Sequence, residues 1–216
     1  LQLVRENPQF VNATASVHPS YLKKLKQREV ETYIHEILNN RQDLVAIGET
    51  GIDYNWVKDP EGRAKQKEVF VQFISLANQL KLPLVIHSRS AAEDTIEILE
   101  QSNARNVQMH MFTQHSQVQR VIDNDWFIYM NTTLLKSKSL RKIARDTPLE
   151  LLLLETDSPW LGIDTSGHLK PRDEVRNEPL NVHRVAKKIG EIKKIDVLEV
   201  DKQTTVNAKK LFNIAN

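Results

Sequence analysis

The sequence predicts a parallel α/β fold, because six short apolar runs alternate with segments of helical periodicity and the links between them are short. The candidate strands are residues 10–17, 44–48, 84–86, 106–109, 126–130 and 150–154. Strand, helix and strand joined by short links are typical of parallel sheets with helices on their faces. The order of the elements therefore predicts the fold class before any motif is considered.

The segments between the candidate strands have apolar residues at intervals of three and four, the spacing of an amphipathic helix. The first stripe consists of Val30, Tyr33, Ile34, Ile37 and Leu38. The second consists of Phe70, Phe73, Ile74, Ala77 and Leu80, and the third of Val118, Val121 and Ile122. Pro83 follows the second stripe, where a helix is expected to have ended. The residues from Asn181 onward are also predicted to be helical.

Two architectures fit this order of elements: a doubly wound open sheet and a (β/α) barrel of the TIM type. A dinucleotide-binding sheet needs a glycine-rich turn after an early strand. The chain has only six glycines and neither a G-x-G-x-x-G nor a P-loop motif. No repeat, low-complexity stretch or linker divides the sequence. We therefore expect a single domain over residues 1–216.

The composition limits the partners and cofactors. The formal charge of +2 neither demands nor excludes a polyanionic partner. No apolar run approaches the ~18 residues of a membrane helix, so no membrane partner is expected. The absence of cysteine means that any metal must bind to His, Asp, Glu or water. The chain begins at Leu1 without a methionine, so the absence of a signal peptide says little about localisation. A cytoplasmic protein and a monomer are therefore only the default expectations.

Five of the six candidate strands are followed by a residue that can bind a metal or move a proton. These residues, in chain order, are His18, Glu49, His87, His110, and the pair Glu155 and Asp157. All of them lie at the carboxyl end of a strand, which is the edge where parallel α/β enzymes build their sites. The pattern predicts that they share one site.

Each of these residues also has a purely structural interpretation. Glu49 would serve as a solvated turn residue, and His87 or His110 as a core histidine with a backbone partner. Asp157 precedes Ser158-Pro159 and would nucleate a turn, while His18 carries the weakest signal by itself. The structural interpretations require the same coincidence at strand after strand. Taken together, the residues favour a common site.

The chemistry of this residue set fits a metal-dependent hydrolase. Imidazoles and carboxylates without thiolates suit zinc, manganese, nickel or, with fewer imidazoles, magnesium. A carboxylate such as Glu49 is able to bridge two ions ~3.5–4 Å apart. Asp157 would both ligate a metal and accept the proton of a bound water. Arg89, two residues after His87, offers a planar fork for a phosphate oxygen or, equally, a salt-bridge partner at a strand end.

The same residues carry a family resemblance. The segments "AIGETGIDY", "LPLVIHSR", "MHMFT", "LLLLETDSPWL" and "RNEPLNV" occur in this order in the chain. In order and spacing they resemble the TatD family of metal-dependent deoxyribonucleases, which belongs to the amidohydrolase-like metal hydrolases. The resemblance extends from about residue 17 to the C-terminus. It implies a (β/α) barrel and one or two divalent ions, either Mg, Mn or Zn.

The resemblance also implies roles for individual residues. The metal-ligand positions are Glu49, His87, His110 and Asp157. By the resemblance Asp157 is the proton acceptor, and His18 lies close to metal and substrate. Glu49 is expected to be catalytic together with Asp157, and Arg89 is expected to contact the substrate through its guanidinium. Glu155 and Asp53 are expected to lie behind the metal ligands and to contact the ligand side chains without binding the metal themselves.

The chain departs from the family pattern in two respects. Ser20 stands where the family often has a second histidine after "HP", and no His-x-His occurs anywhere in the sequence. Only six of the eight barrel strands are evident. We therefore expect a chain that is incomplete at its N-terminus, with either an open barrel whose gap is covered or a segment absent from the sequence.

The leading functional hypothesis is hydrolysis of phosphodiester bonds in DNA, as an exonuclease on single strands or strand ends. The near-neutral charge argues against an extended grip on duplex DNA. A related barrel hydrolase that acts on another ester or an amide is the second hypothesis, because fold alone does not select the substrate. The third is a non-catalytic relative, which the absence of His-x-His favours and the retained ligand positions oppose.

Overall fold

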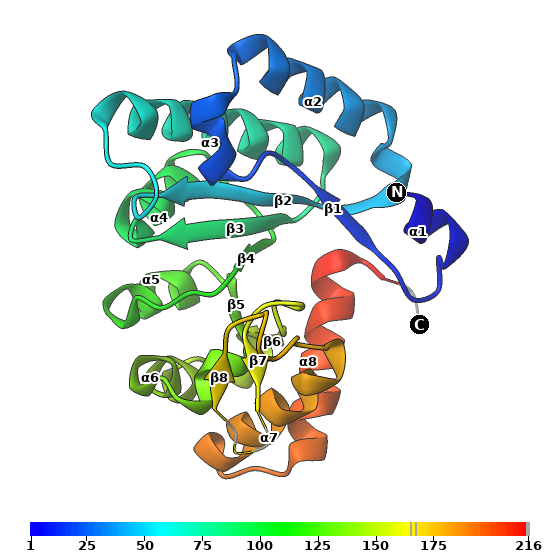
Figure 1. Cartoon of the computed structure of the whole chain (residues 1–216), viewed down its shortest axis with the longest axis vertical. Helices are drawn as coiled ribbons and strands as arrows, with labels where there is room; N and C mark the ends of the chain where they lie inside the picture. Colours follow the sequence, from blue (N-terminus) through cyan, green and yellow to red (C-terminus); the bar gives the residue numbers. More distant parts are fainter. Residues whose placement is uncertain (165, 167, 215–216) are drawn as a thin grey trace. The chain divides into compact units, whose positions relative to one another are not determined.

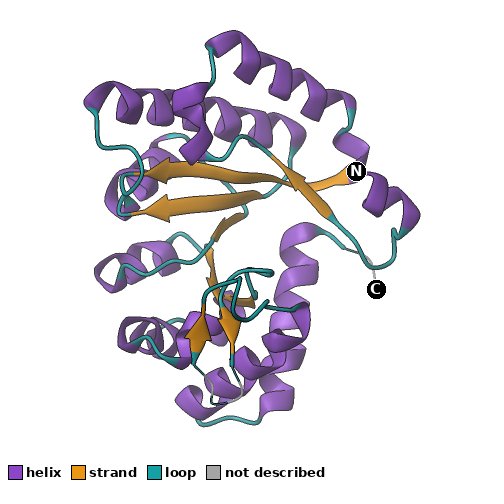
Figure 2. Cartoon of the chain, in the orientation of Figure 1, coloured by secondary structure: helices purple, strands orange, loops and turns teal. Residues whose placement is uncertain are grey.

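The computed structural model of the chain describes residues 1–164, 166 and 168–214. It contains two compact units, one formed by Leu1–His110 with the residues from Leu211 onward and the other by Met111–Lys210. Within each unit, strands alternate with helices, as Figures 1 and 2 show. The predicted α/β class is confirmed.

The first unit contains four parallel strands in the order of the sequence. These are β1 (Ala13–Ala15), β2 (Leu44–Asp53), β3 (Leu84–Arg89) and β4 (Val107–Met109). The helices of this unit are α1 (Gln2–Glu6), α2 (Gln27–Asn39), α3 (Pro60–Leu80) and α4 (Ala92–Gln101), with short 3-10 helices η1 at Pro19–Lys24 and η2 at Arg41–Asp43. The helix α3 packs against β2, and α2 packs against α3.

The second unit contains a parallel pair, β5 (Phe127–Met130) and β6 (Leu152–Leu154). An antiparallel pair follows, β7 (Gly162–Ile163) with β8 (Leu169–Lys170). The helices are α5 (Val118–Asp123), α6 (Lys138–Asp146), α7 (Val182–Lys193) and α8 (Val197–Phe212). Four 3-10 helices lie between these elements: η3 (His115–Gln117), η4 (Thr132–Leu135), η5 (Leu149–Leu151) and η6 (Pro179–Asn181).

All six predicted strands exist, but their lengths differ from the prediction. The first was predicted over residues 10–17, and only Ala13–Ala15 pairs with β2. The second and third were predicted to end at residues 48 and 86, whereas β2 runs to Asp53 and β3 to Arg89. The β2–β3 register shifts between Gly48 and Thr50, so the chain stays in the sheet across this irregularity. Glu49 and His87 consequently lie within their strands, which corrects their predicted place at the strand ends.

Two glycines allow β2 and β3 to approach closely on either side of Glu49. A Cβ atom at Gly48 would overlap the side chain of Val85, and one at Gly51 would overlap the carbonyl oxygen of His87. Gly51 also has φ +139°, a conformation that L-residues rarely adopt. These glycines therefore have a packing role inside the sheet.

The core of the first unit is built around α3. Asp59 caps this helix by accepting a hydrogen bond from the Gly62 N–H, and Pro60 occupies the first turn. Phe70 and Phe73 are fully buried on its inner face. Burying such a side chain is worth roughly 1.5–3 kcal/mol relative to exposing it. This packing fixes β2, and hence Glu49, against a rigid support.

The core of the second unit lies between β6, α6 and α7. Ile143 of α6 and Ile189 of α7 are fully buried. The amide of Asn207 in α8 is buried and donates to the carbonyl oxygens of Leu149 and Leu152, each at 2.8 Å. The start of β6 is thereby tied to α8.

No helix in the described part of the chain combines the length and the apolarity needed to cross a membrane.

Replacement of Gly51 by alanine tests the close approach of β2 and β3. The variant is expected to lose at least about 2 kcal/mol of unfolding free energy, because backbone strain and overpacking each cost about 1–3 kcal/mol. Urea denaturation measures this loss, with the exposed helical change Ser75→Ala in α3 as the control. Equal stability of the two variants would contradict the contact between Gly51 and the backbone of His87.

Candidate metal centre

Three side chains of the first unit form a cluster that could hold a metal ion: His18, Glu49 and His87. Each offers one ligand atom, and these atoms all lie within 4.8 Å of one another. All three side chains are partly buried, with 28%, 26% and 15% of their surface exposed. They were predicted from three separate strands, and the structure brings them together.

The pairing of β2 with β3 positions two members of the cluster. Glu49 lies at the register shift of β2, and its Oε1 is 2.8 Å from Nδ1 of His87 in β3. The glycines on either side of Glu49 permit this approach. A bulge commonly redirects a side chain toward a functional site, and it does so here.

His18 joins the cluster from the segment after β1. It caps η1, and its Nδ1 accepts a hydrogen bond from the Ser20 N–H at 3.2 Å. Its Nε2 lies 3.2 Å from Nδ1 of His87 and 3.7 Å from Oε2 of Glu49. The hydroxyl of Ser20 lies 2.8 Å from the same Nδ1, so Ser20 orients the ring.

His110 lies immediately after β4, with its Nε2 3.6 Å from Oε1 of Glu49. Its N–H donates to the carbonyl of Ile86 at 2.9 Å, which continues the pairing of β4 with β3. Three histidines predicted for the site therefore surround the carboxylate of Glu49 in the first unit.

Asp53 supports the cluster from behind. It is completely buried, and its Oδ2 lies 2.8 Å from Nε2 of His87. Gln66 of α3 holds the backbone of Asp53 by accepting its N–H at 3.1 Å. The Asp53 carboxylate accepts from Nε2–H of His87, so the ring is held with Nδ1 facing Glu49 and His18. His87 is thus oriented to ligate through Nδ1.

The electrostatics of the cluster suit a cation. Burial alone would raise the pKa of Glu49, but the hydrogen bond with His87 and the fields of the three histidines hold it below its usual range. Burial, and then the neighbouring His87, lower the pKa of His18, although Glu49 and Asp53 oppose this effect. An ionised carboxylate and a neutral imidazole are the forms that bind metals. The donor set present therefore fits a divalent ion.

Glu155 and Asp157 lie in the second unit, after β6. The N–H of Glu155 donates to Met130 of β5 at 3.0 Å, and its carboxylate accepts from Asn131 at 3.2 Å. Asp157 has φ +61° and lies in the turn that its carbonyl closes by accepting the Trp160 N–H at 2.8 Å. Burial and the nearby Glu155 carboxylate raise the pKa of Tyr129.

Asn177 holds the turn that carries Asp157. It is 1% exposed, and its Nδ2 donates to the carbonyl of Thr156 at 2.6 Å. Its own N–H donates to the carbonyl of Pro159 at 3.0 Å. These two hydrogen bonds span the turn on both sides of Asp157. The motif "RNEPLNV" contains Asn177, but no residue of this motif was predicted to take part in the site.

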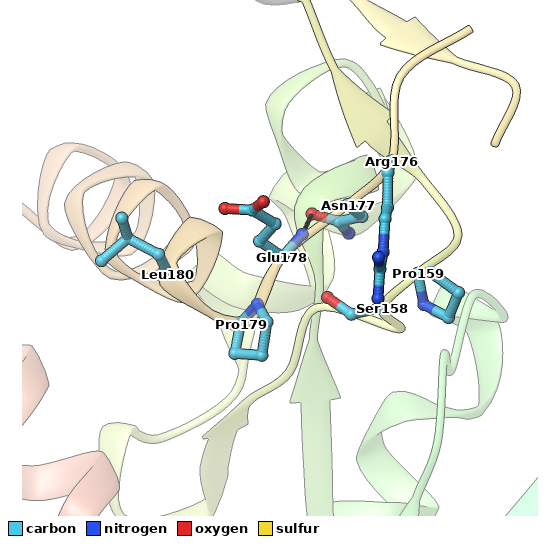
Figure 3. Close-up of a pocket in the computed structure, with 7 residues that line it drawn as sticks. All are labelled: Ser158, Pro159, Arg176, Asn177, Glu178, Pro179 and Leu180. Carbon is cyan, nitrogen blue, oxygen red and sulfur yellow. Dashed lines mark hydrogen bonds between the residues drawn. The ribbon is translucent and has the colours of Figure 1, made fainter. Parts of the chain in front are cut away.

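A pocket of ≈ 490 Å³ lies beside this turn (Figure 3). Ser158 and Pro159 line it together with Arg176, Asn177 and Glu178 and the following residues Pro179 and Leu180. Its volume is in the range of small-molecule sites. The exposed side chain of Arg176 places a positive charge in the pocket next to Ser158, the residue after Asp157.

Comparison with known proteins identifies the family. The family model described as TatD related DNase matches residues 1–213. The chain belongs to the TatD-related DNase family. It is 36% identical over 214 residues to the metal-dependent hydrolase YabD of Bacillus subtilis, covering 97% of this chain and 80% of the relative. It is 33% identical over 221 residues to the human deoxyribonuclease TATDN3, covering 98% and 78% respectively.

Solved structures of TatD proteins share the fold. YJJV, a TATD homolog from Escherichia coli, superposes with a TM-score of 0.86 at 24% identity, covering 98% of this chain and 80% of that chain. A hydrolase of the TatD family from Entamoeba histolytica superposes with a TM-score of 0.82 at 22% identity, covering 97% and 78%. These likenesses confirm the predicted fold class, the TIM-type barrel.

Replacement of Asp53 by asparagine tests its support of His87. The amide is expected to weaken the binding of Mn²⁺ or Zn²⁺ by about 10–100-fold, because partners behind a histidine ligand fix its tautomer and orientation. Isothermal titration calorimetry of the metal-free protein measures the affinity. The matched control is Asp43→Asn, which neutralises a partly buried carboxylate that is paired with Arg5 and not with a residue of the cluster. Unchanged affinity in Asp53→Asn would show that His87 needs no such partner.

Replacement of Asn177 by aspartate tests the hold on the Asp157 turn. The change replaces the Nδ2 donor with an oxygen, so the hydrogen bond to the Thr156 carbonyl is lost. Because the turn is then less restrained, we expect faster amide hydrogen exchange across residues 156–160 in the metal-free protein. The matched control is Asn207→Asp, which removes a buried amide at the other end of β6. Both variants should lose about 1–3 kcal/mol of stability, since each leaves buried carbonyls unsatisfied. Equal exchange in the two variants would contradict a specific role for Asn177.

Proposed function

We propose that the chain is a metal-dependent hydrolase that cleaves phosphodiester bonds in DNA. The convergence of His18, Glu49 and His87 in one cluster carries this proposal, together with the family to which the chain belongs. The human relative is named a deoxyribonuclease, and the Bacillus relative a metal-dependent hydrolase. A donor set of imidazoles around an ionised carboxylate supports the hydrolytic reaction for this chain.

The metal ligands in this proposal are Glu49, His87, His110 and Asp157, with His18 in the same cluster. One or two divalent ions, Mg, Mn or Zn, are the cofactors. Bound to such donors, a divalent ion lowers the pKa of a coordinated water toward neutrality. His18, His87 and His110 each lie within 3.7 Å of an oxygen of Glu49, which supports a role for this carboxylate as a ligand that would be shared between ions.

Asp157 is the proton acceptor in this reaction. The carboxylate of an aspartate is able to take the proton of the attacking water. The turn held by Asn177 limits the positions that its carboxylate can occupy. A positioned base is worth about 10²–10⁴-fold in rate. Glu155 supports this region through Asn131 and does not replace Asp157.

The substrate is proposed to be the end of a DNA strand or a single strand, cleaved as an exonuclease. The near-neutral charge supplies little non-specific affinity for an extended duplex. Arg89 ends β3 two residues after His87, and its exposed guanidinium is available to a phosphate oxygen.

The decisive assay follows the release of mononucleotides from short single-stranded DNA with added Mg²⁺, Mn²⁺ or Zn²⁺. Glu49→Ala and Asp157→Ala are each expected to lower the rate at least about 100-fold, because one removes a ligand and the other the base. The control Glu68→Ala removes an exposed carboxylate of α3 and should leave the rate unchanged.

Three outcomes would overturn the nuclease proposal. Hydrolysis of a carboxylic ester or amide without DNA cleavage would identify a related hydrolase with another substrate. No turnover with any of the three metals would indicate a non-catalytic relative. Release that persists in both alanine variants would show that these carboxylates do not form the site.

A further inference from the structure

Trp56 is an exposed aromatic side chain beside the candidate metal centre. It lies in the turn after β2, and 68% of its surface is accessible. A single exposed apolar residue needs no explanation by itself. The residues around Trp56 show whether its indole is placed to bind a ligand.

The turn that carries Trp56 is rigid at both ends. Asp53 before it is completely buried, and Val57 after it is 3% exposed. The N–H of Val57 donates to the carbonyl of Asp53 at 3.2 Å, and the Val57 carbonyl accepts from Arg63 of α3 at 3.2 Å. Between these anchors the backbone of Trp56 is held in place, and its indole is exposed.

Asp53 links this turn directly to the metal centre. Its Oδ1 accepts the N–H of Trp56 at 2.8 Å, while its Oδ2 lies 2.8 Å from Nε2 of His87. One carboxylate thus fixes the backbone of Trp56 and the ring of a candidate metal ligand. The position of the indole is therefore coupled to the position of the site.

Arg89 adds a positive charge next to the indole. It is the register partner of Asp53 in the β2–β3 pairing, and its carbonyl accepts the Tyr54 N–H at 3.0 Å. Its Cζ lies 6.0 Å from the centroid of the Trp56 ring. Within the described residues its guanidinium has no hydrogen bond or salt bridge to a side chain. The guanidinium thus lies over the ring without a hydrogen bond to any described side chain, and an aromatic ring with a cation beside it matches the two parts of a nucleotide, its base and its phosphate.

We propose that Trp56 is a stacking platform for an unpaired base of single-stranded DNA, and that Arg89 contacts the phosphate of the same nucleotide. This inference rests on the proposed nuclease function and names how its substrate is held. An unpaired base at a strand end has a free face for the indole, whereas a base inside a duplex is covered by its neighbours. The platform therefore selects strand ends and single strands.

The first measurement is the binding of a short fluorescein-labelled single-stranded DNA in EDTA, followed by anisotropy, so that no cleavage occurs. Trp56→Ala is expected to raise the Kd about tenfold, because loss of one stacked base typically has this order of effect. Trp56→Phe keeps an aromatic face and should recover most of the affinity. The control Tyr33→Ala removes an exposed ring of α2, 45% accessible, and should bind like the wild type.

The salt dependence of binding separates the two roles. Stacking involves no counterion release, so Trp56→Ala should leave the slope of log K against log salt unchanged. Arg89→Ala should reduce the magnitude of this slope by about 0.7, the value for one phosphate contact on a single strand. A change of slope in Trp56→Ala would contradict the assignment of the indole to the base.

An abasic scan locates the stacked nucleotide. At one position of the oligonucleotide, replacing the nucleotide with an abasic residue should weaken wild-type binding about as much as Trp56→Ala does. The same replacement should have no further effect in Trp56→Ala, because the contact is already absent. Additive losses at every position would overturn the proposal.

The assays distinguish failure of this inference from failure of the nuclease proposal. Metal-dependent release by the wild type, with Kd and KM unchanged in Trp56→Ala, would retain the nuclease and refute the platform. A wild type that neither binds nor cleaves single-stranded DNA would overturn both. Thermal unfolding of each variant confirms that the exposed substitution leaves the fold intact.

Discussion

The close contact between β2 and β3 is the constraint on which the candidate site depends. Gly48 and Gly51 let the two backbones approach on either side of Glu49, and the register shift between them turns its carboxylate onto His87. A side chain at either glycine would push the strands apart. The ligand distances would then change together, because His18 and His110 are arranged around the same carboxylate. The packing of α3 on β2 holds this contact in place.

The charges of the cluster compensate one another. A carboxylate taken from water loses solvation, and the hydrogen bond with His87 restores part of it. The same geometry favours a metal, since an ion between Glu49 and the histidines would replace a shared proton and relieve the repulsion among the rings. Asp53 is buried outside the ligand cluster and completes the hydrogen bonding of His87 on its far side. The fold thus prepares a metal site at little cost to its own stability.

The sequence predicted the strands better than their ends. Apolar runs identify buried strands, but Gly48, Gly51 and Asp53 break the pattern, so residues that continue β2 look like a turn. The two-residue strands β7 and β8 are too short to have a period. His18 carried the weakest signal and nevertheless lies in the cluster, because its place depends on the path of η1 and not on a strand end. Asn177 acts on carbonyls 18 and 21 residues before it, Pro159 and Thr156, a relation that no local pattern reveals.

The two units use the same device to hold their functional carboxylates and histidines. In the first unit, the buried side chain of Asp53 bonds to His87 on one oxygen and to the backbone of Trp56 on the other. In the second, buried Asn177 bonds on both sides of Asp157. An apolar residue at position 53 or 177 would fill the same space but would not fix the orientation of its neighbours. A polar side chain with all its hydrogen bonds made fixes the groups that it bonds to in one orientation. The indole of Trp56 is exposed with the guanidinium of Arg89 over it, and in the proposed complex a nucleotide would contact both groups.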